Sequence, residues 1–134
     1  MAFGLSKIRM FAGVYSLFVG LSMILMWMAL YIGGSISEVG NEPMRIGMHI
    51  AAEILTGILL ITGAYGLLGN KKWAFNVYLI SLGMLIYTLI ASPGYYADKG
   101  DIVFVGMFTI LLIPAVAFVV LSFARKEEFT NFNR

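Results

Sequence analysis

Four long apolar segments constrain this chain more than any other feature of its sequence. They cover residues 11–33, 46–68, 73–91 and 102–123. Each has the ~20 residues that an α-helix needs to cross a hydrocarbon layer of about 30 Å. Because lipid offers the backbone no hydrogen-bond partner, such segments have to be helical. We therefore predict an all-α, integral membrane four-helix bundle.

The composition agrees with a membrane protein and excludes other classes. Of the 134 residues, 60% are hydrophobic and 12% are charged, whereas a soluble domain has about 25% charged residues. The nine basic and seven acidic residues do not gather into a basic face, so we expect no nucleic-acid partner. The chain has no cysteine, which excludes disulfides, thiolate metal sites and haem attachment. With short connections between the segments, residues 1–134 are predicted to form a single transmembrane domain.

The basic residues predict how the protein lies in the membrane. Lys and Arg are enriched in short loops on the cytoplasmic side. Seven of the nine basic residues flank the segments on one side: before the first, between the second and third, or after the fourth. On the other side lie Arg45 and Lys99. We therefore predict a multi-pass protein of the cell membrane with both termini in the cytoplasm.

Turn-forming residues predict where the helices begin and end. The turn at residues 69–72 is so short that the segments around it must be antiparallel neighbours. Asn41 as an N-cap and Pro43 in the first turn predict the start of the second helix. Pro93 and Gly94 predict a turn that follows the third helix.

Two further patterns predict contacts. Small residues in membrane helices allow close backbone approach. Positions of this kind are Ser16, Gly20, Gly57, Gly63, Gly66 and Gly83. After the fourth segment, a short tail of mixed charge predicts a boundary anchor, with Phe129 and Phe132 in contact with the membrane surface or a partner.

One polar stripe interrupts the second segment. His49 is the only histidine in the chain, and Glu53 is the only acidic residue inside any segment. Arg45, His49 and Glu53 follow one another at intervals of four, so they share one helix face. Glu53 lies roughly 10 Å below the outer edge of the apolar segment, at 1.5 Å per residue. A carboxylate at this depth is costly, so it must face the bundle or a wet cavity, or be protonated.

Aromatic residues at a similar depth extend the predicted site. Trp27 and Tyr31 lie four residues apart in the first segment, and Tyr87 lies in the outer third of the third segment. Aromatic residues around a polar pair are typical of a pocket for an amphipathic molecule such as a lipid or quinone. The candidate ligand-binding residues are therefore His49, Glu53, Arg45, Tyr87, Trp27 and Tyr31. We expect none of these residues to be catalytic.

Three functions remain open for this site. An outward-facing site that binds a small or lipidic ligand, an ion or a proton fits, because intramembrane ionisable residues are usually functional. A polar clamp that fixes helix register fits an accessory subunit of a membrane complex. A small membrane enzyme acting on a lipophilic substrate would use Glu53 or His49 as general base. We rank the enzyme last of the three.

The sequence also predicts which cofactors and partners to expect. His49 and Glu53 supply two metal ligands, whereas zinc sites need three or four protein ligands. One histidine supplies half of a haem axial pair, so we expect neither a metal nor a cofactor. Besides the lipid bilayer, a homo-oligomer or a larger complex is expected, since 14.7 kDa is little for a transport path.

Overall fold

The computed structural model describes residues 7–34 and 38–130, and within them it confirms the all-α four-helix bundle. Each of the four long helices is apolar enough over its length to cross a membrane. They are α1 (Lys7–Ile32), α3 (Pro43–Leu68), α4 (Ala74–Asp98) and α5 (Ile102–Ala124). Two short helices, α2 (Glu38–Asn41) and α6 (Lys126–Thr130), lie beside their ends.

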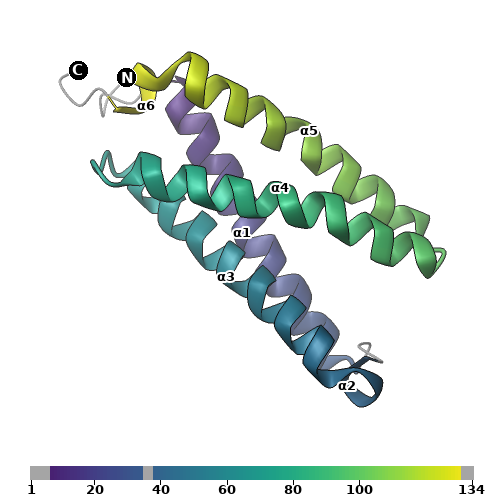
Figure 1. Cartoon of the computed structure of the whole chain (residues 1–134). Helices are drawn as coiled ribbons and strands as arrows, with labels where there is room; N and C mark the ends of the chain where they lie inside the picture. The colour runs from purple at the N-terminus through teal and green to yellow at the C-terminus, as the bar shows by residue number, and fades with distance from the viewer. Residues whose placement is uncertain (1–6, 35–37, 131–134) are drawn as a thin grey trace.

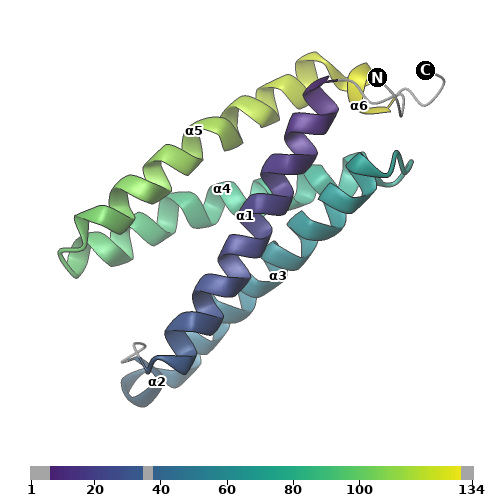
Figure 2. The same cartoon turned by 180° about the vertical axis from the view of Figure 1, so that it is seen from behind.

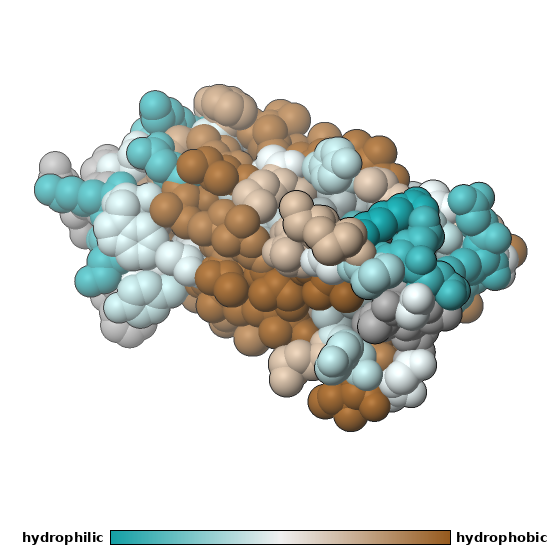
Figure 3. Space-filling view, turned by 60° about the horizontal axis from the view of Figure 1, so that its bottom comes forward, coloured by the Kyte–Doolittle hydropathy of each residue, from teal (hydrophilic) through white to brown (hydrophobic). Residues whose placement is uncertain are grey.

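The bundle has two distinct ends (Figure 1). We call the end with α2 and the α4–α5 connection the loop end, and the end with the start of α1, the α3–α4 turn and α6 the terminal end. Figure 3 shows apolar surface across the middle of one face and polar surface towards both ends. This distribution suits a protein whose middle lies in hydrocarbon and whose ends lie in water.

The long helices pack in a row rather than in a closed square. α1 packs on α3, α3 on α4 and α4 on α5. The first and last helices meet where the Tyr15 hydroxyl donates to the Leu111 carbonyl at 2.8 Å and the Tyr15 ring lies 5.2 Å from that of Phe118. From there α1 and α5 separate towards the loop end (Figures 1 and 2). The bundle is therefore open on one side.

Arg9 joins α1 to the end of α3. Its side chain is buried, and Nε donates to the Leu67 carbonyl at 2.7 Å. Nη2 donates to the carbonyls of Gly66 and Lys71 at 3.4 and 3.3 Å. The last carbonyls of a helix have no partner within that helix. Arg9 thus caps α3 from within α1, although the sequence predicted it outside the first helix.

The structure corrects the predicted turn at Pro93 and Gly94. α4 continues through Pro93 to Asp98, and the turn falls at Lys99 and Gly100, where Gly100 has φ +74°. Helical continuation keeps the backbone hydrogen-bonded close to lipid, where a turn would expose polar groups. The added helical turn places Tyr96 against the rings of Phe104 and Phe108 on α5, with ring centroids 4.7 and 5.6 Å away.

The start of α3 is partly as predicted. Pro43 occupies the first turn of the helix, where its missing N–H has no cost. The N-cap, however, is Glu42 and makes no side-chain cap hydrogen bond. Asn41, predicted as the cap, instead ends the short helix α2.

Most of the predicted small residues lie at close helix contacts. A Cβ added to Gly20 would lie 2.8 Å from the Gly57 carbonyl, and one added to Gly57 would lie 3.1 Å from the Gly20 carbonyl. Gly63 lies equally close to the backbone of α4 at Tyr78. Gly83 was predicted wrongly, because a Cβ there would meet nothing within 4 Å.

The prediction for Phe129 was also wrong. Its side chain is fully buried in the bundle rather than exposed to membrane or partner. Its ring lies 5.5 Å from those of Phe75 and Tyr78 on α4. The short helix α6 folds back on the terminal end because an aromatic side chain gains more in this packed site than in water. Phe132 lies outside the described residues.

Candidate functional site

Glu53 is the centre of a polar cluster that joins three helices. Its side chain is 3% exposed. Trp27 on α1 donates from Nε1 to Oε2 at 3.2 Å, and Ser92 on α4 donates from Oγ to Oε1 at 3.1 Å. His49, one turn earlier on α3, has its Nε2 3.4 Å from Oε1. The carboxyl group is therefore surrounded by polar partners inside an apolar bundle.

The arrangement follows from the positions of these residues along antiparallel helices. Trp27 lies five residues from the end of α1, and Ser92 lies six residues from the end of α4. Glu53 lies ten residues into α3, which runs the opposite way to both. These offsets are roughly 8 to 15 Å at 1.5 Å per residue. All three side chains thus meet in the half of the bundle nearer the loop end.

The hydrogen-bond donors around Glu53 show that its carboxyl group acts as an acceptor. The indole N–H of Trp27 can only donate, so Oε2 must accept. A buried polar group is costly when it loses its partner, so Glu53, Trp27 and Ser92 depend on one another. With 2% of the whole residue exposed, Glu53 is not itself open to a ligand. It acts as a fixed acceptor that holds α1, α3 and α4 together.

His49 connects this cluster to an open pocket. Its side chain is 36% exposed, and its ring lies edge-on to Trp27 with centroids 5.7 Å apart. His49 also lines a pocket of about 500 Å³ between the start of α3 and the end of α4. Besides His49, residues with polar side chains that line it are Glu42, Arg45, Tyr95, Asp98 and Lys99.

The pocket carries charges of both signs. Arg45 pairs with Glu42 at 3.3 Å, and both side chains are more than half exposed. The ammonium of Lys99 lies 4.4 Å from the centre of the Tyr95 ring. Asp98 adds a second carboxylate to the lining. The two acidic and two basic side chains thus balance one another in the lining.

The predicted site residues separate into three groups. His49, Glu53 and Trp27 meet in the polar cluster. Arg45 lines the pocket but is paired with Glu42 rather than with the stripe. Tyr31 and Tyr87 are 69% and 73% exposed and are not brought to the cluster or to the pocket lining. Their positions suit side chains that face lipid or the membrane interface.

Ser92 belongs to the cluster and was missed from the sequence. The reason is Pro93, which placed Ser92 in a predicted turn. A signal for it does exist: Ser81, Thr88 and Ser92 recur at helical spacing, and all three are buried on one face of α4. A helix continued through Pro93 would have predicted Ser92 as the partner that α4 supplies to Glu53.

The cluster does not resemble a metal centre. In residues 7–34 and 38–130, no group of three His, Cys, Asp or Glu side chains could hold a metal ion. The chemistry available is that of hydrogen-bond acceptors, one imidazole and the paired charges of the pocket.

These features define a small four-helix membrane protein with a buried carboxylate cluster beside a polar pocket. The chain belongs to the family described as "Domain of unknown function (DUF8058)", whose model matches residues 6–133. No curated protein and no solved structure matches the sequence.

Proposed function

We propose that this membrane protein binds a small ligand with charges of both signs in the pocket at the loop end. The observation that carries the proposal is the position of His49, which lines the pocket and has its Nε2 3.4 Å from the buried Glu53 carboxylate. The imidazole presents a polar contact to the pocket, and Glu53 holds it in place. The pocket's acidic and basic side chains suit the two charges of such a ligand.

The orientation is part of the same proposal. The excess of basic residues at the terminal end favours a cytoplasmic position for that end. The pocket then faces outward and receives its ligand from outside the cell or from the outer membrane surface.

A second function, that of a structural clamp, is favoured by a separate observation. Glu53 accepts from Trp27 on α1 and from Ser92 on α4, which fixes three helices whether or not a ligand binds. The clamp and the binding site thus fall on different residues. Glu53 is a positioning residue, and His49 is the contact with the ligand.

The test uses the single histidine of the chain. Protein labelled with ¹⁵N-histidine in maltoside micelles gives one imidazole side chain to follow by NMR, and phosphoethanolamine serves as a zwitterionic probe. We expect the probe to shift the His49 signals saturably and to raise the unfolding temperature. Glu53→Gln should weaken binding and move the His49 signals even without the probe, because the imidazole loses a carboxylate partner.

The matched control is Tyr87→Phe, which removes a polar group from an exposed side chain outside the pocket. It should leave both the probe affinity and the unfolding temperature unchanged. Signals of His49 that stay in place at saturating phosphoethanolamine would overturn the ligand proposal. A fall in unfolding temperature for Glu53→Gln, without any probe binding in the unaltered protein, would leave the clamp as the function.

A further inference from the structure

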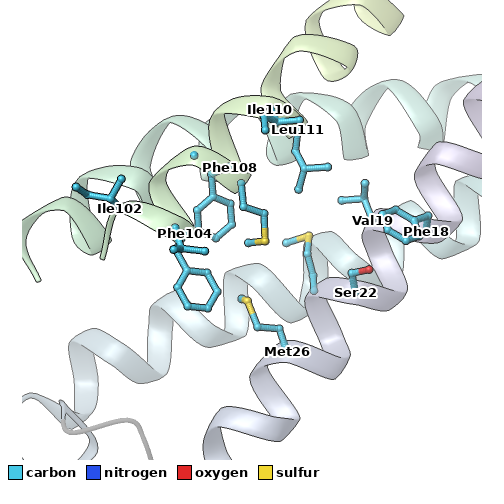
Figure 4. A pocket seen from close by; sticks show the side chains of 13 residues that line it. Phe18, Val19, Ser22, Met26, Ile102, Phe104, Phe108, Ile110 and Leu111 are labelled. Carbon is cyan, nitrogen blue, oxygen red and sulfur yellow. The ribbon is translucent and has the colours of Figure 1, made fainter. Parts of the chain in front are cut away.

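A second cavity lies on another side of the bundle, in the opening between α1 and α5. It is a groove of about 700 Å³, and its walls are apolar side chains and flexible methionines (Figure 4). Its lining includes Val19, Met23 and Met26 from α1 and Phe104, Met107 and Phe108 from α5. Among all its lining residues, Ser22 alone has a polar side chain.

The groove has a closed end and a defined length. It closes where Tyr15 on α1 is hydrogen-bonded to the Leu111 carbonyl on α5. Its lining on α5 begins at Ile102, the first residue of that helix, and ends at Leu111. These nine steps correspond to about 14 Å of helix. One leaflet is half of a hydrocarbon layer of about 30 Å, so the groove matches the depth of a single leaflet.

A groove of this kind cannot stay empty or wet within a membrane. Water needs several polar partners to occupy a cavity, and this lining offers one hydroxyl. An empty space would cost the lining side chains their dispersion contacts. Hydrocarbon is the one medium present at this depth, and methionine side chains adapt readily to its shape.

The narrow end of the groove favours a lipid chain over a second copy of the protein. A neighbouring helix with its side chains is about 10 Å wide. α1 and α5 converge at the Tyr15–Leu111 hydrogen bond, so a helix could not enter the narrow end of the groove. A single hydrocarbon chain is thinner than a helix and can reach that end.

We propose that the groove between α1 and α5 binds one acyl chain of a phospholipid from the leaflet at the loop end. The site is separate from the polar pocket, which lies between α3 and α4. Its occupation fills the opening of the bundle and supports α5, which otherwise packs on α4 and, near the terminal end, on α1 and α6.

Two glycines provide a matched pair of variants. Gly106 lines the groove on α5, and a Cβ there would meet nothing within 4 Å. Gly83 on α4 is exposed, is equally free of contacts and lies outside the groove. Gly106→Leu fills the groove, and Gly83→Leu makes the same change elsewhere. Ser22→Phe fills the groove from the opposite wall and serves if Gly106→Leu does not fold.

The experiment is photo-crosslinking of the full chain in nanodiscs made of phosphatidylcholine with a diazirine near the end of one acyl chain. We expect crosslinks concentrated on groove residues of α1 and α5 in the unaltered protein and in Gly83→Leu. Gly106→Leu should lose most of them. The proposal is overturned if crosslinks spread evenly over all exposed helix faces, or if Gly106→Leu keeps the groove crosslinks.

Native mass spectrometry from maltoside micelles identifies other occupants. One retained phospholipid per chain, lost in Gly106→Leu and kept in Gly83→Leu, supports the proposal. A retained isoprenoid lipid in place of the phospholipid would overturn it. A dimer that Gly106→Leu dissociates would also overturn it, because the groove would then be an interface between copies.

Discussion

At the scale of single residues, the carboxyl group of Glu53 is the most informative feature of this protein. It accepts hydrogen bonds from Trp27 and Ser92 and lies beside His49, with 3% of its side chain exposed. A lone acidic residue in a membrane helix predicts a site, but it does not predict its partners. Here the partners are two donors from other helices, so the carboxylate connects three helices whether or not a ligand binds.

The cluster leads to a prediction about stability. Hydrogen bonds between membrane helices contribute about 0.6 kcal/mol each on average, so Ser92→Ala should lower the free energy of unfolding by about that amount. Glu53→Ala removes two such bonds and should lower it by about 1.2 kcal/mol. Denaturation followed by circular dichroism in detergent measures both. Thr109→Ala is the control, because its hydroxyl bonds only the Val105 carbonyl of its own helix. A loss for Ser92→Ala no larger than for this control would argue against the cluster.

At the scale of helices, the contact between α1 and α3 depends on two glycines. Gly20 and Gly57 face one another so closely that each would place a Cβ within about 3 Å of the other's carbonyl oxygen. Such close approach lets backbone atoms of two helices pack without a side chain between them. It also brings Trp27 within reach of Glu53, because both pairs lie on the same two helices.

The glycines allow a paired test of helix packing. Gly20→Ala should lower the free energy of unfolding by about 1–3 kcal/mol, because the added methyl group overpacks the contact. Gly83→Ala should raise it by up to about 1 kcal/mol, since alanine favours the helix and the position is open. Unfolding in detergent compares the two. Equal effects of the two variants would contradict the close α1–α3 contact.

In α4 and α6, the surroundings of the helix determine where it ends or how it packs. Pro93 lies within α4, which continues to Asp98 because the apolar surroundings favour a hydrogen-bonded backbone. The continuation brings Ser92 into the Glu53 cluster and Tyr96 onto α5. At the other end of the bundle, α6 folds back and buries Phe129. Both features involve residues that were predicted to lie in a connection or in the tail.

At the scale of the whole molecule, charge distinguishes the two ends of the bundle, whereas helix packing distinguishes its sides. The basic residues distinguish the terminal end from the loop end, and this difference predicts its orientation. The packing order α1–α3–α4–α5 makes the bundle open between its first and last long helices. The polar pocket and the apolar groove therefore occupy separate sides of one small protein.

The orientation can be tested with single cysteines, because the chain has none of its own. Lys99→Cys at the loop end should react with a membrane-impermeant maleimide in intact cells. Lys72→Cys at the terminal end should react only after the cells are opened, since basic ends stay in the cytoplasm. The opposite labelling pattern would place the termini outside and turn the pocket towards the cytoplasm.

The long apolar helices, the antiparallel pairing of α3 with α4 and the pairing of His49 with Glu53 all follow from the sequence alone. Each depends on local periodicity or on a short connection, and both are properties of residues close together in the chain. Four features follow only from the packing of the helices: the role of Ser92, the cap that Arg9 places on α3, the burial of Phe129 and the opening between α1 and α5. These depend on how helices far apart in the chain pack together, because side chains from separate helices must meet to satisfy a buried polar group or to fill a space.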